Sequence, residues 1–376
     1  MSIGSWNLSL HSRSNQTYSM SLWTKRQRKT KRKRMKLITS GLILSFLSAV
    51  GFANHPPSQS GRPSVSSTAT SVASYKVVNV MPAFWQFWEQ SQTLDETAKI
   101  RLFRELVLQP NKEVFEGFTG TSSDARLARY LVNVQPYIPA MRRFSERLET
   151  ELPRYGQVFN KKFPDAQGVG EIYFMPNLLG GWDAGGGNPG GHPMLVFGVD
   201  SIVKLKKEGF NLATLFHHEL FHLYHDQFHP EWRDKNRAKG EMPLYWLMWM
   251  EGLATHVSKV LNPKASADEI LLPDELIRDT EQQMPKLAKE LRENLDSTST
   301  DAFMNFLSGS PKRKDVPARC GYYIGMLVAR ELNRKHSLRE LARLRDPQLR
   351  KEIEIALIKL ESRARENVKH FAVASH

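Results

Sequence analysis

The stretch HHELFHLYHDQFH, His217 to His229, holds five of the chain's twelve histidines within thirteen residues. Inside it, HELFH matches the pattern HExxH, with histidines at 218 and 222 and a glutamate at 219. Leucine and phenylalanine recur around these residues at helical spacing, which predicts a buried helix. Successive helix positions are about 100° apart, so His218 and His222 share one face, one turn apart.

Two histidines on one helix face are typical of a zinc site. Imidazole nitrogens bind Zn²⁺ at about 2.0–2.1 Å, and a catalytic site adds a third protein ligand and keeps a fourth position open. Glu219, next to the first histidine, reaches a water at the metal rather than the metal itself. We therefore expect one Zn²⁺ per chain, bound by His218 and His222, with Glu219 as the catalytic base.

The third ligand has two candidates in the sequence. In HExxHxxGxxH the last residue would bind, but Phe228 stands there and His225 replaces the glycine, so His229 comes one residue late. Glu251 follows twenty-nine residues after His222, in LYWLMWMEGLATHVSKVL (residues 244–261), an apolar stretch that predicts a helix. An unpaired charge there is costly, and a metal would compensate it. We expect Glu251 to be the ligand; the alternative is a surface pair with lysine or arginine.

HELFH followed by WMEGLATH resembles the gluzincin metallopeptidases, which carry HExxH on one helix and a glutamate ligand on a second. The EGxA form is similar to the peptidase-MA-like and predicted zinc-dependent protease families of exported bacterial proteins. The resemblance covers about residues 170–335 and implies an α+β fold, mostly α-helical and zincin-like, with a small sheet next to the HExxH helix. The thermolysin group has an aspartate four residues after its glutamate ligand; Thr255 stands there in this chain.

The resemblance also implies how substrate binds. A strand upstream of the HExxH helix pairs with the extended backbone of a peptide or protein substrate, which would make MLVFGVD (residues 194–200) an edge strand. A tyrosine or histidine from a later segment stabilises the oxyanion, and in GYYIG this is Tyr322 or Tyr323, with Tyr322 favoured. The other interpretation is that both tyrosines pack in a core. Arg319, just before them, either binds a substrate carboxylate or is solvated.

Together these patterns predict a zinc metallopeptidase of the gluzincin type, in which Glu219 acts as the general base on a metal-activated water. The alternative is an exported protein that binds zinc without turnover. Glu219 favours the enzyme, because a structural zinc site has no need of a carboxylate that is not a ligand.

The formal charge of +14 is concentrated at the N-terminus. Residues 1–53 contain ten Lys and Arg and no Asp or Glu, which leaves +4 for the rest. We therefore expect no binding of nucleic acid. The single cysteine, Cys320, excludes an internal disulfide and a thiolate zinc site.

The N-terminal pattern is typical of an export signal. A basic run, residues 25–36, precedes fourteen largely apolar residues, 37–50, and small residues that favour cleavage after Ala53. The apolar run is shorter than the roughly 20 residues of a spanning helix. We expect a periplasmic or secreted protein whose true start is Met35; an uncleaved membrane anchor is the alternative.

The remaining chain has two predicted parts. Residues 54–75 are rich in Ser, Thr and Pro and predict a disordered linker. Residues 76–376 predict a single zincin-like metallopeptidase domain, with a helical N-terminal part (76–160), a catalytic core (168–335) and C-terminal helices (336–376). In the core, two predicted strands, residues 171–176 and 194–200, flank a glycine-rich loop.

Overall fold

The computed structural model describes residues 70–72, 74–206, 210–232 and 242–373. The predicted export signal, with its start at Met35, lies outside the described residues, as does most of the predicted linker. Within the described part of the chain, no helix combines the length and the apolarity needed to cross a membrane.

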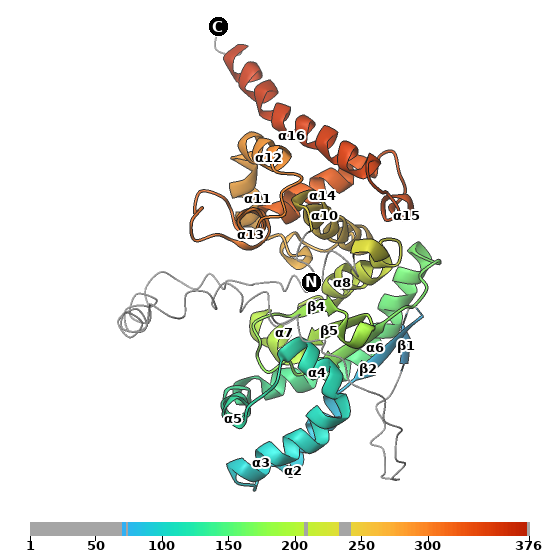
Figure 1. The fold of residues 1–376 in the computed structure, drawn as a ribbon, viewed down its shortest axis with the longest axis vertical. Coiled ribbons are helices and arrows are strands. Elements are labelled where there is room, and N and C mark those ends of the chain that lie inside the picture. Colours follow the sequence, from blue (N-terminus) through green and yellow to red (C-terminus); the bar gives the residue numbers. More distant parts are fainter. Residues whose placement is uncertain (1–69, 73, 207–209, 233–241, 374–376) are drawn as a thin grey trace, which may run out of the picture. The chain divides into compact units, whose positions relative to one another are not determined.

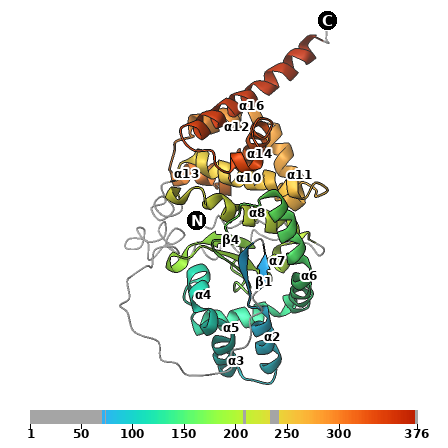
Figure 2. The same cartoon turned by 90° about the vertical axis from the view of Figure 1, so that its right-hand side faces the viewer.

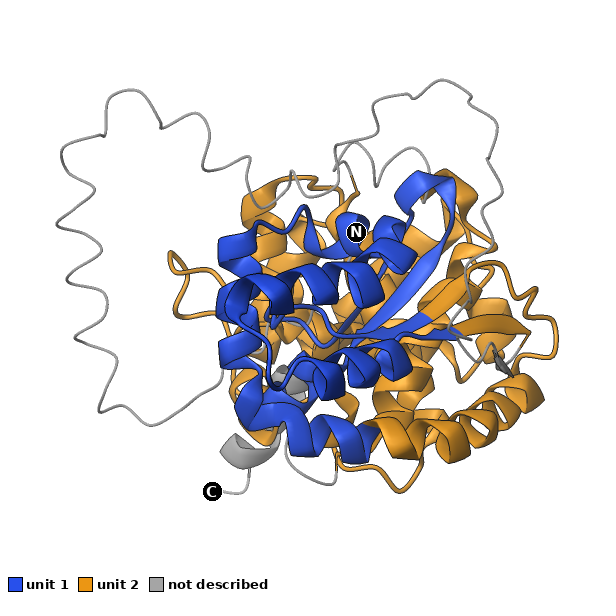
Figure 3. Ribbon diagram, turned by 90° about the horizontal axis from the view of Figure 1, so that it is seen from below, with its two compact units in different colours: residues 1–68, 78–144, 173–206 blue, residues 69–77, 145–172, 207–376 orange. Residues whose placement is uncertain are grey.

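The residues group into two compact units, coloured separately in Figure 3. Among the described residues, those within 78–144 and 173–206 form unit 1, and those within 70–77, 145–172 and 210–373 form unit 2.

Five strands form one sheet, in the order β1-β2-β3-β5-β4. Their bounds are Thr70–Val72 (β1), Tyr75–Asn79 (β2), Glu171–Met175 (β3), Ala184–Gly187 (β4) and Met194–Gly198 (β5). β1 pairs antiparallel with β2, and β4 pairs antiparallel with β5. Helices make up most of the rest, as Figure 1 shows, so the predicted mostly helical α+β fold is confirmed.

Two predictions about the strands are wrong. The predicted linker does not extend to residue 75, because Thr70–Val72 pair with β2 and Tyr75 is buried. The strand at Met194–Gly198 is not an edge strand, because β5 lies between β3 and β4. The edge is β4, inside the stretch that the sequence assigns to a loop. Glycines carry little β-propensity, so the sequence of β4, AGGG, does not reveal a strand.

The helices of unit 1 enclose an aromatic core. Phe87 of α2 packs edge-on against Phe103 of α3, with ring centroids 4.9 Å apart, and Phe103 contacts Tyr130 of α5. All three rings are buried. The helices are Met81–Gln90 (α2), Glu96–Phe103 (α3), Lys112–Thr119 (α4), Asp124–Asn133 (α5) and Val199–Leu205 (α7).

Unit 2 holds the other helices, including the HExxH helix and the predicted glutamate helix. α6 (Ile138–Lys162) begins in unit 1 and continues into unit 2. The others are Leu212–Asp226 (α8), Leu244–Leu261 (α10), Asp274–Glu281 (α11), Met284–Glu293 (α12), Thr300–Phe303 (α13), Cys320–Leu332 (α14), Leu338–Leu341 (α15) and Gln348–Val373 (α16). The helix predicted at 244–261 is therefore confirmed with its bounds.

Helix α8 is buried nearly all round. Every residue of α8 except His222 and Asp226 is buried, so neighbouring elements must cover the whole helix. Phe163, the first residue after α6, packs on Tyr224, with ring centroids 4.6 Å apart. α10 covers another face of α8 and also contacts α14, as Figures 1 and 2 show. This packing fixes the HExxH helix along its length.

Two glycines let α10 and α14 cross at backbone contact. A Cβ atom added at Gly252 of α10 would collide with the backbone of Gly325 in α14. A Cβ added at Gly325 would lie 2.5 Å from the carbonyl oxygen of Met248. Only glycine fits at such a crossing. The pair therefore sets the distance between the helix that carries Glu251 and the helix that carries Tyr322.

We expect Gly252→Ala to destabilise the protein by about 3 kcal/mol, because the added methyl group meets backbone atoms that cannot rotate aside. Denaturation in urea, followed by far-UV circular dichroism, measures the change. Gly186→Ala is the control, because the nearest atom to its added Cβ is 3.8 Å away. Equal stability of both variants would contradict the close crossing.

Candidate metal centre

Three predicted ligands, His218 and His222 of α8 and Glu251 of α10, meet at one point. The Nε2 atoms of His218 and His222 are 3.2 Å apart. Oε2 of Glu251 lies 3.3 Å from Nε2 of His218 and 3.7 Å from Nε2 of His222. Glu251, twenty-nine residues after His222 in the sequence, thus brings a carboxylate oxygen next to the two imidazole nitrogens. Within the described ranges, these three residues form the group whose possible metal-ligand atoms all lie within 4.8 Å of one another.

These separations fit zinc. In a tetrahedron with metal–ligand distances of about 2.05 Å, neighbouring ligands lie about 3.3 Å apart. Two imidazoles and one carboxylate form a donor set that catalytic zinc sites use, with the fourth corner left open. Zinc would therefore fit among His218, His222 and Glu251 without rearrangement of the three side chains.

Neighbouring charges and burial set the pKa values of the three predicted ligands. Burial alone would raise the pKa of Glu251, but positive charge on His222 and bonds from both histidines hold this pKa well below its ordinary value. Burial would lower the pKa of His222, but the charges of Glu251, Glu219 and Asp226 raise it instead. Burial lowers the pKa of His218. The buried carboxylate of Glu251 therefore remains ionised beside the imidazoles, and an ionised carboxylate is the form that binds a cation.

Solvent reaches the site on one side. The side chains of His218 and Glu251 are 3% and 4% exposed, whereas that of His222 is 16% exposed. The exposed edge of His222 is therefore the side from which a water or a substrate can approach, as a catalytic metal site requires.

Glu219, the predicted base, lies in α8 and is buried. Its charge acts on His222, where it helps to raise the pKa, and on the hydroxyl of Tyr322. The carboxylate therefore belongs to the same electrostatic site as the three ligands.

The structure distinguishes Tyr322 from Tyr323, which the sequence leaves open. Both tyrosines lie in the first turn of α14. Tyr322 is buried, and burial and the negative charge of nearby Glu251 raise its pKa well above the ordinary value. The hydroxyl of Tyr323 bonds to Glu281 of α11 instead. Only Tyr322 of this pair faces the metal ligands, and its hydroxyl remains protonated and able to donate.

The other histidines of the opening stretch have separate partners. His217 Nε2 donates to the carbonyl of Tyr155 at 3.0 Å, and its Nδ1 accepts from Asn262 at 3.0 Å. His229 Nε2 donates to the carbonyl of Ala342 at 2.9 Å. The ring of His225 stacks on Trp246, with centroids 5.2 Å apart. These three are packing neighbours, consistent with the rejection of His229 as a ligand.

The residues behind the ligands differ from the thermolysin arrangement. Thr255 donates its hydroxyl to the carbonyl of Glu251, one turn back along α10. His256 bonds at 2.9 Å to Asn333, the C-terminal cap of α14. Nδ1 of His218 is buried and makes no hydrogen bond with the described residues. No carboxylate therefore orients His218 from the position that Thr255 occupies.

Arg319 is a site residue for which the sequence gives no decisive signal. It is the N-terminal cap of α14, in a left-handed conformation with φ 65°. Its guanidinium carbon lies 4.3 Å from the centre of the Tyr322 ring. Its positive charge adds to the lowering of the pKa of His218, and it partly opposes the rise in the pKa of Tyr322. A spacing pattern could not find Arg319, because its place depends on the loop before α14.

A comparison with protein families finds one match. The family described as "Putative zinc dependent peptidase (DUF5700)" matches residues 108–347, which is more than half of the chain and includes every residue discussed above for this site. No curated protein and no solved structure matches the chain.

Proposed function

Since the chain belongs to the family described as "Putative zinc dependent peptidase (DUF5700)", we propose that it hydrolyses peptide bonds as a gluzincin. In this proposal His218, His222 and Glu251 bind one Zn²⁺, and Glu219 is the general base. The observation that carries it is the convergence of three ligand atoms beside a buried glutamate that is not among them.

The mechanism divides between the metal and the chain. Zinc bound by these ligands would lower the pKa of a water molecule and polarise the carbonyl of the scissile peptide. Glu219 takes a proton from the water as the water oxygen attacks the carbonyl carbon. It then delivers this proton to the leaving nitrogen as the carbon–nitrogen bond breaks.

Tyr322 stabilises the developing negative charge. Its hydroxyl remains protonated, because burial and the charge of Glu251 raise its pKa. A hydroxyl that turns from Glu251 to the carbonyl oxygen of the substrate would act as an oxyanion donor.

The proposed substrate is a peptide or an unfolded protein segment bound as an extended strand. Strand addition is the binding mode that the resemblance to the gluzincins implies. In this proposal residues 76–376 act as one peptidase domain.

Glu219→Gln should keep zinc and lose hydrolysis, because glutamine leaves the three ligands intact but cannot take the proton. Zinc is measured by mass spectrometry of the purified chain, with about one per chain expected. Hydrolysis is measured on an unfolded protein such as reduced, alkylated casein. Glu251→Ala is the paired variant, which should lose zinc as well as activity.

The two variants separate the alternatives. Normal hydrolysis by Glu219→Gln would exclude Glu219 as the base. Unchanged zinc affinity of Glu251→Ala would exclude the gluzincin ligand set. A wild-type chain that binds zinc and hydrolyses nothing would support the zinc-binding protein without turnover.

Tyr322→Phe should lower kcat by about a hundredfold to a thousandfold at unchanged zinc content, because one oxyanion donor is removed. Tyr323→Phe is the matched control on the neighbouring residue, whose hydroxyl bonds to Glu281. The control should retain kcat. Equal loss in the two variants would indicate a general disturbance of α14 and count against Tyr322 as the donor.

We also propose that the protein is exported, from the basic and apolar pattern of residues 25–53. N-terminal sequencing of the protein recovered from the periplasm or the medium should give a chain that begins at Asn54. A chain that keeps residues 25–50 and sediments with membranes would support the uncleaved anchor instead.

A further inference from the structure

A guanidinium nitrogen beside the metal ligands is without a partner. Nη2 of Arg319 is buried and makes no hydrogen bond to any described residue. Two other basic side chains of this region are paired: Lys312 with Asp301, and Arg313 with Asp315. A buried charged donor without a hydrogen-bond partner is destabilising, and a ligand that accepts a hydrogen bond from it would remove this penalty.

The stacking of Arg319 leaves its donors free. The guanidinium lies over the face of the Tyr322 ring, with its carbon 4.3 Å from the ring centre. A stacked guanidinium still directs its N–H groups outward in its own plane. Two parallel N–H groups in that plane match the two oxygens of a carboxylate. Tyr322 thus orients Arg319 without satisfying its hydrogen-bonding groups.

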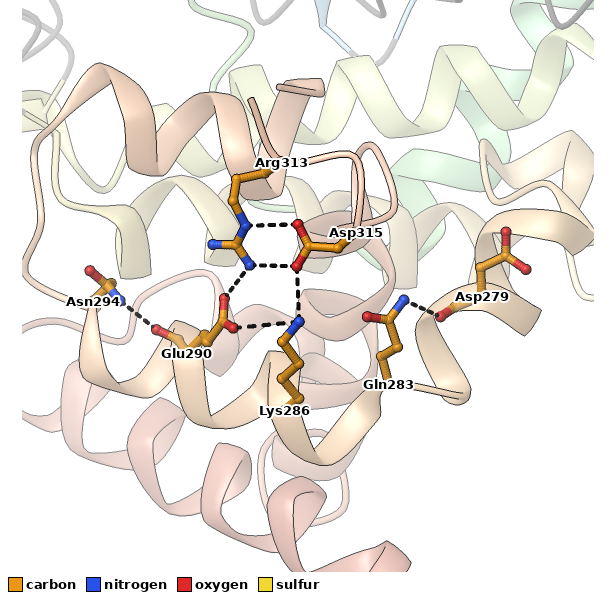
Figure 4. Close-up of polar contacts among 7 residues, drawn as sticks. All are labelled: Asp279, Gln283, Lys286, Glu290, Asn294, Arg313 and Asp315. Carbon is orange, nitrogen blue, oxygen red and sulfur yellow. Dashed lines mark hydrogen bonds and ion pairs between the residues drawn. The ribbon is translucent and has the colours of Figure 1, made fainter. Parts of the chain in front are cut away.

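Four ion-paired side chains anchor the loop that leads to Arg319, as Figure 4 shows. Arg313 bonds to both oxygens of Asp315 at 2.9 and 3.0 Å and to Glu290 of α12 at 3.0 Å. Lys286 of α12 bonds to Asp315 at 2.9 Å. The loop is thereby tied to α12 a few residues before Arg319, which holds a left-handed backbone. Strain of this kind persists where the surroundings over-determine it, often at binding sites.

The charge balance favours an anion. The charges that act most strongly on the hydroxyl of Tyr322 include those of Glu251, Glu219 and Arg319. A divalent zinc ion would neutralise the two carboxylates, so the positive charge of Arg319 would remain uncompensated. A carboxylate on the substrate would neutralise this charge and also bond to Nη2.

We propose that Arg319 binds a carboxylate of the substrate next to the metal centre, so that the site selects peptides with a carboxylate at that place. The carboxylate belongs either to the C-terminus of the peptide or to an Asp or Glu side chain near the scissile bond. This inference rests on the proposed function for its meaning in catalysis, but peptide binding tests it separately.

The binding test uses zinc-loaded chain with Glu219→Gln, which does not depend on turnover. Fluorescein-labelled peptides of one alanine-rich sequence carry a single Glu moved through successive positions, and a matched series carries Gln. Each peptide is made with a free C-terminal carboxylate and with a C-terminal amide. Fluorescence anisotropy should show binding about tenfold to a hundredfold tighter for the matching acidic form, as charged hydrogen bonds provide.

Substitution of Arg319 assigns the preference. Arg319→Gln in the same background should remove the difference between acidic and neutral peptides while zinc content stays the same. Arg330→Gln is the control, because it removes a positive charge from an exposed position of the same helix. Arg319→Lys should keep only part of the preference, because lysine has the charge but not the planar fork.

The outcomes separate the two sources of the carboxylate. A preference for the free C-terminus alone assigns the α-carboxylate and an exopeptidase. A preference for Glu over Gln at one position assigns an acidic side chain and cleavage within chains. With active enzyme, Arg319→Gln should raise KM for the preferred peptide and leave KM for its neutral partner unchanged.

Two results would overturn the inference. The first is equal binding of acidic and neutral peptides by the chain that retains Arg319. The second is a preference that persists in Arg319→Gln. If Arg319→Gln does not fold, full retention of the preference by Arg319→Lys would count against the planar contact. A chain that binds acidic peptides through Arg319 but cleaves none would contradict the proposed function and leave this inference standing.

Discussion

The close approach of α10 to α14 is the constraint on which the site depends. Gly252 follows the ligand Glu251 directly, and it meets Gly325 across the helix crossing. Because the two backbones touch there, Tyr322 at the start of α14 lies close enough to Glu251 for the charge of Glu251 to raise its pKa. A side chain at the crossing would separate the helices and with them the ligand and the oxyanion donor. The glycine of the EGxA pattern thus has a packing reason that is distinct from metal chemistry.

Burial gives the metal centre its character. Glu251 is 3% exposed and would be protonated in an apolar surrounding of this kind, were it not for the two imidazoles that face it. Desolvation strengthens every interaction among these groups. Desolvation also makes an uncompensated buried charge destabilising, so a bound cation would stabilise the carboxylate of Glu251. The side chain of His222 is 16% exposed, and this opening is required for function because a completely closed site could not admit a substrate.

The sequence predicts that His218, His222 and Glu251 converge, because their positions follow from helix geometry. HExxH specifies its own face, and the apolar run around Glu251 specifies a buried helix that begins after Pro243. Strand β4 could not be predicted in this way, because AGGG owes its conformation to pairing with β5. The choice between Tyr322 and Tyr323 also required the structure, because both lie in a buried first turn whose orientation depends on the crossing with α10. Arg319 depends on a loop and on ion pairs to α12, which no periodic pattern encodes.

The absence of an aspartate at Thr255 raises the question of what orients the HExxH helix. His218 Nδ1 has no bond to the described residues, so its ring is positioned by packing and by Glu251 rather than by a carboxylate behind it. The end of α8 is fixed from another direction. Tyr224 donates to Asp165 at 3.1 Å, and Asp165 also pairs with Arg339 at 3.1 Å and with Arg343.

His229 adds its bond to Ala342 in the same C-terminal segment. These contacts tie the last turn of α8 to the chain around α15, while Phe163, just after α6, packs against the same turn at Tyr224. A helix held so firmly at its end and buried along its length leaves its histidines little freedom to rotate. Rigid packing of the whole helix can therefore replace the local hydrogen bond that orients a histidine ligand in other zinc sites.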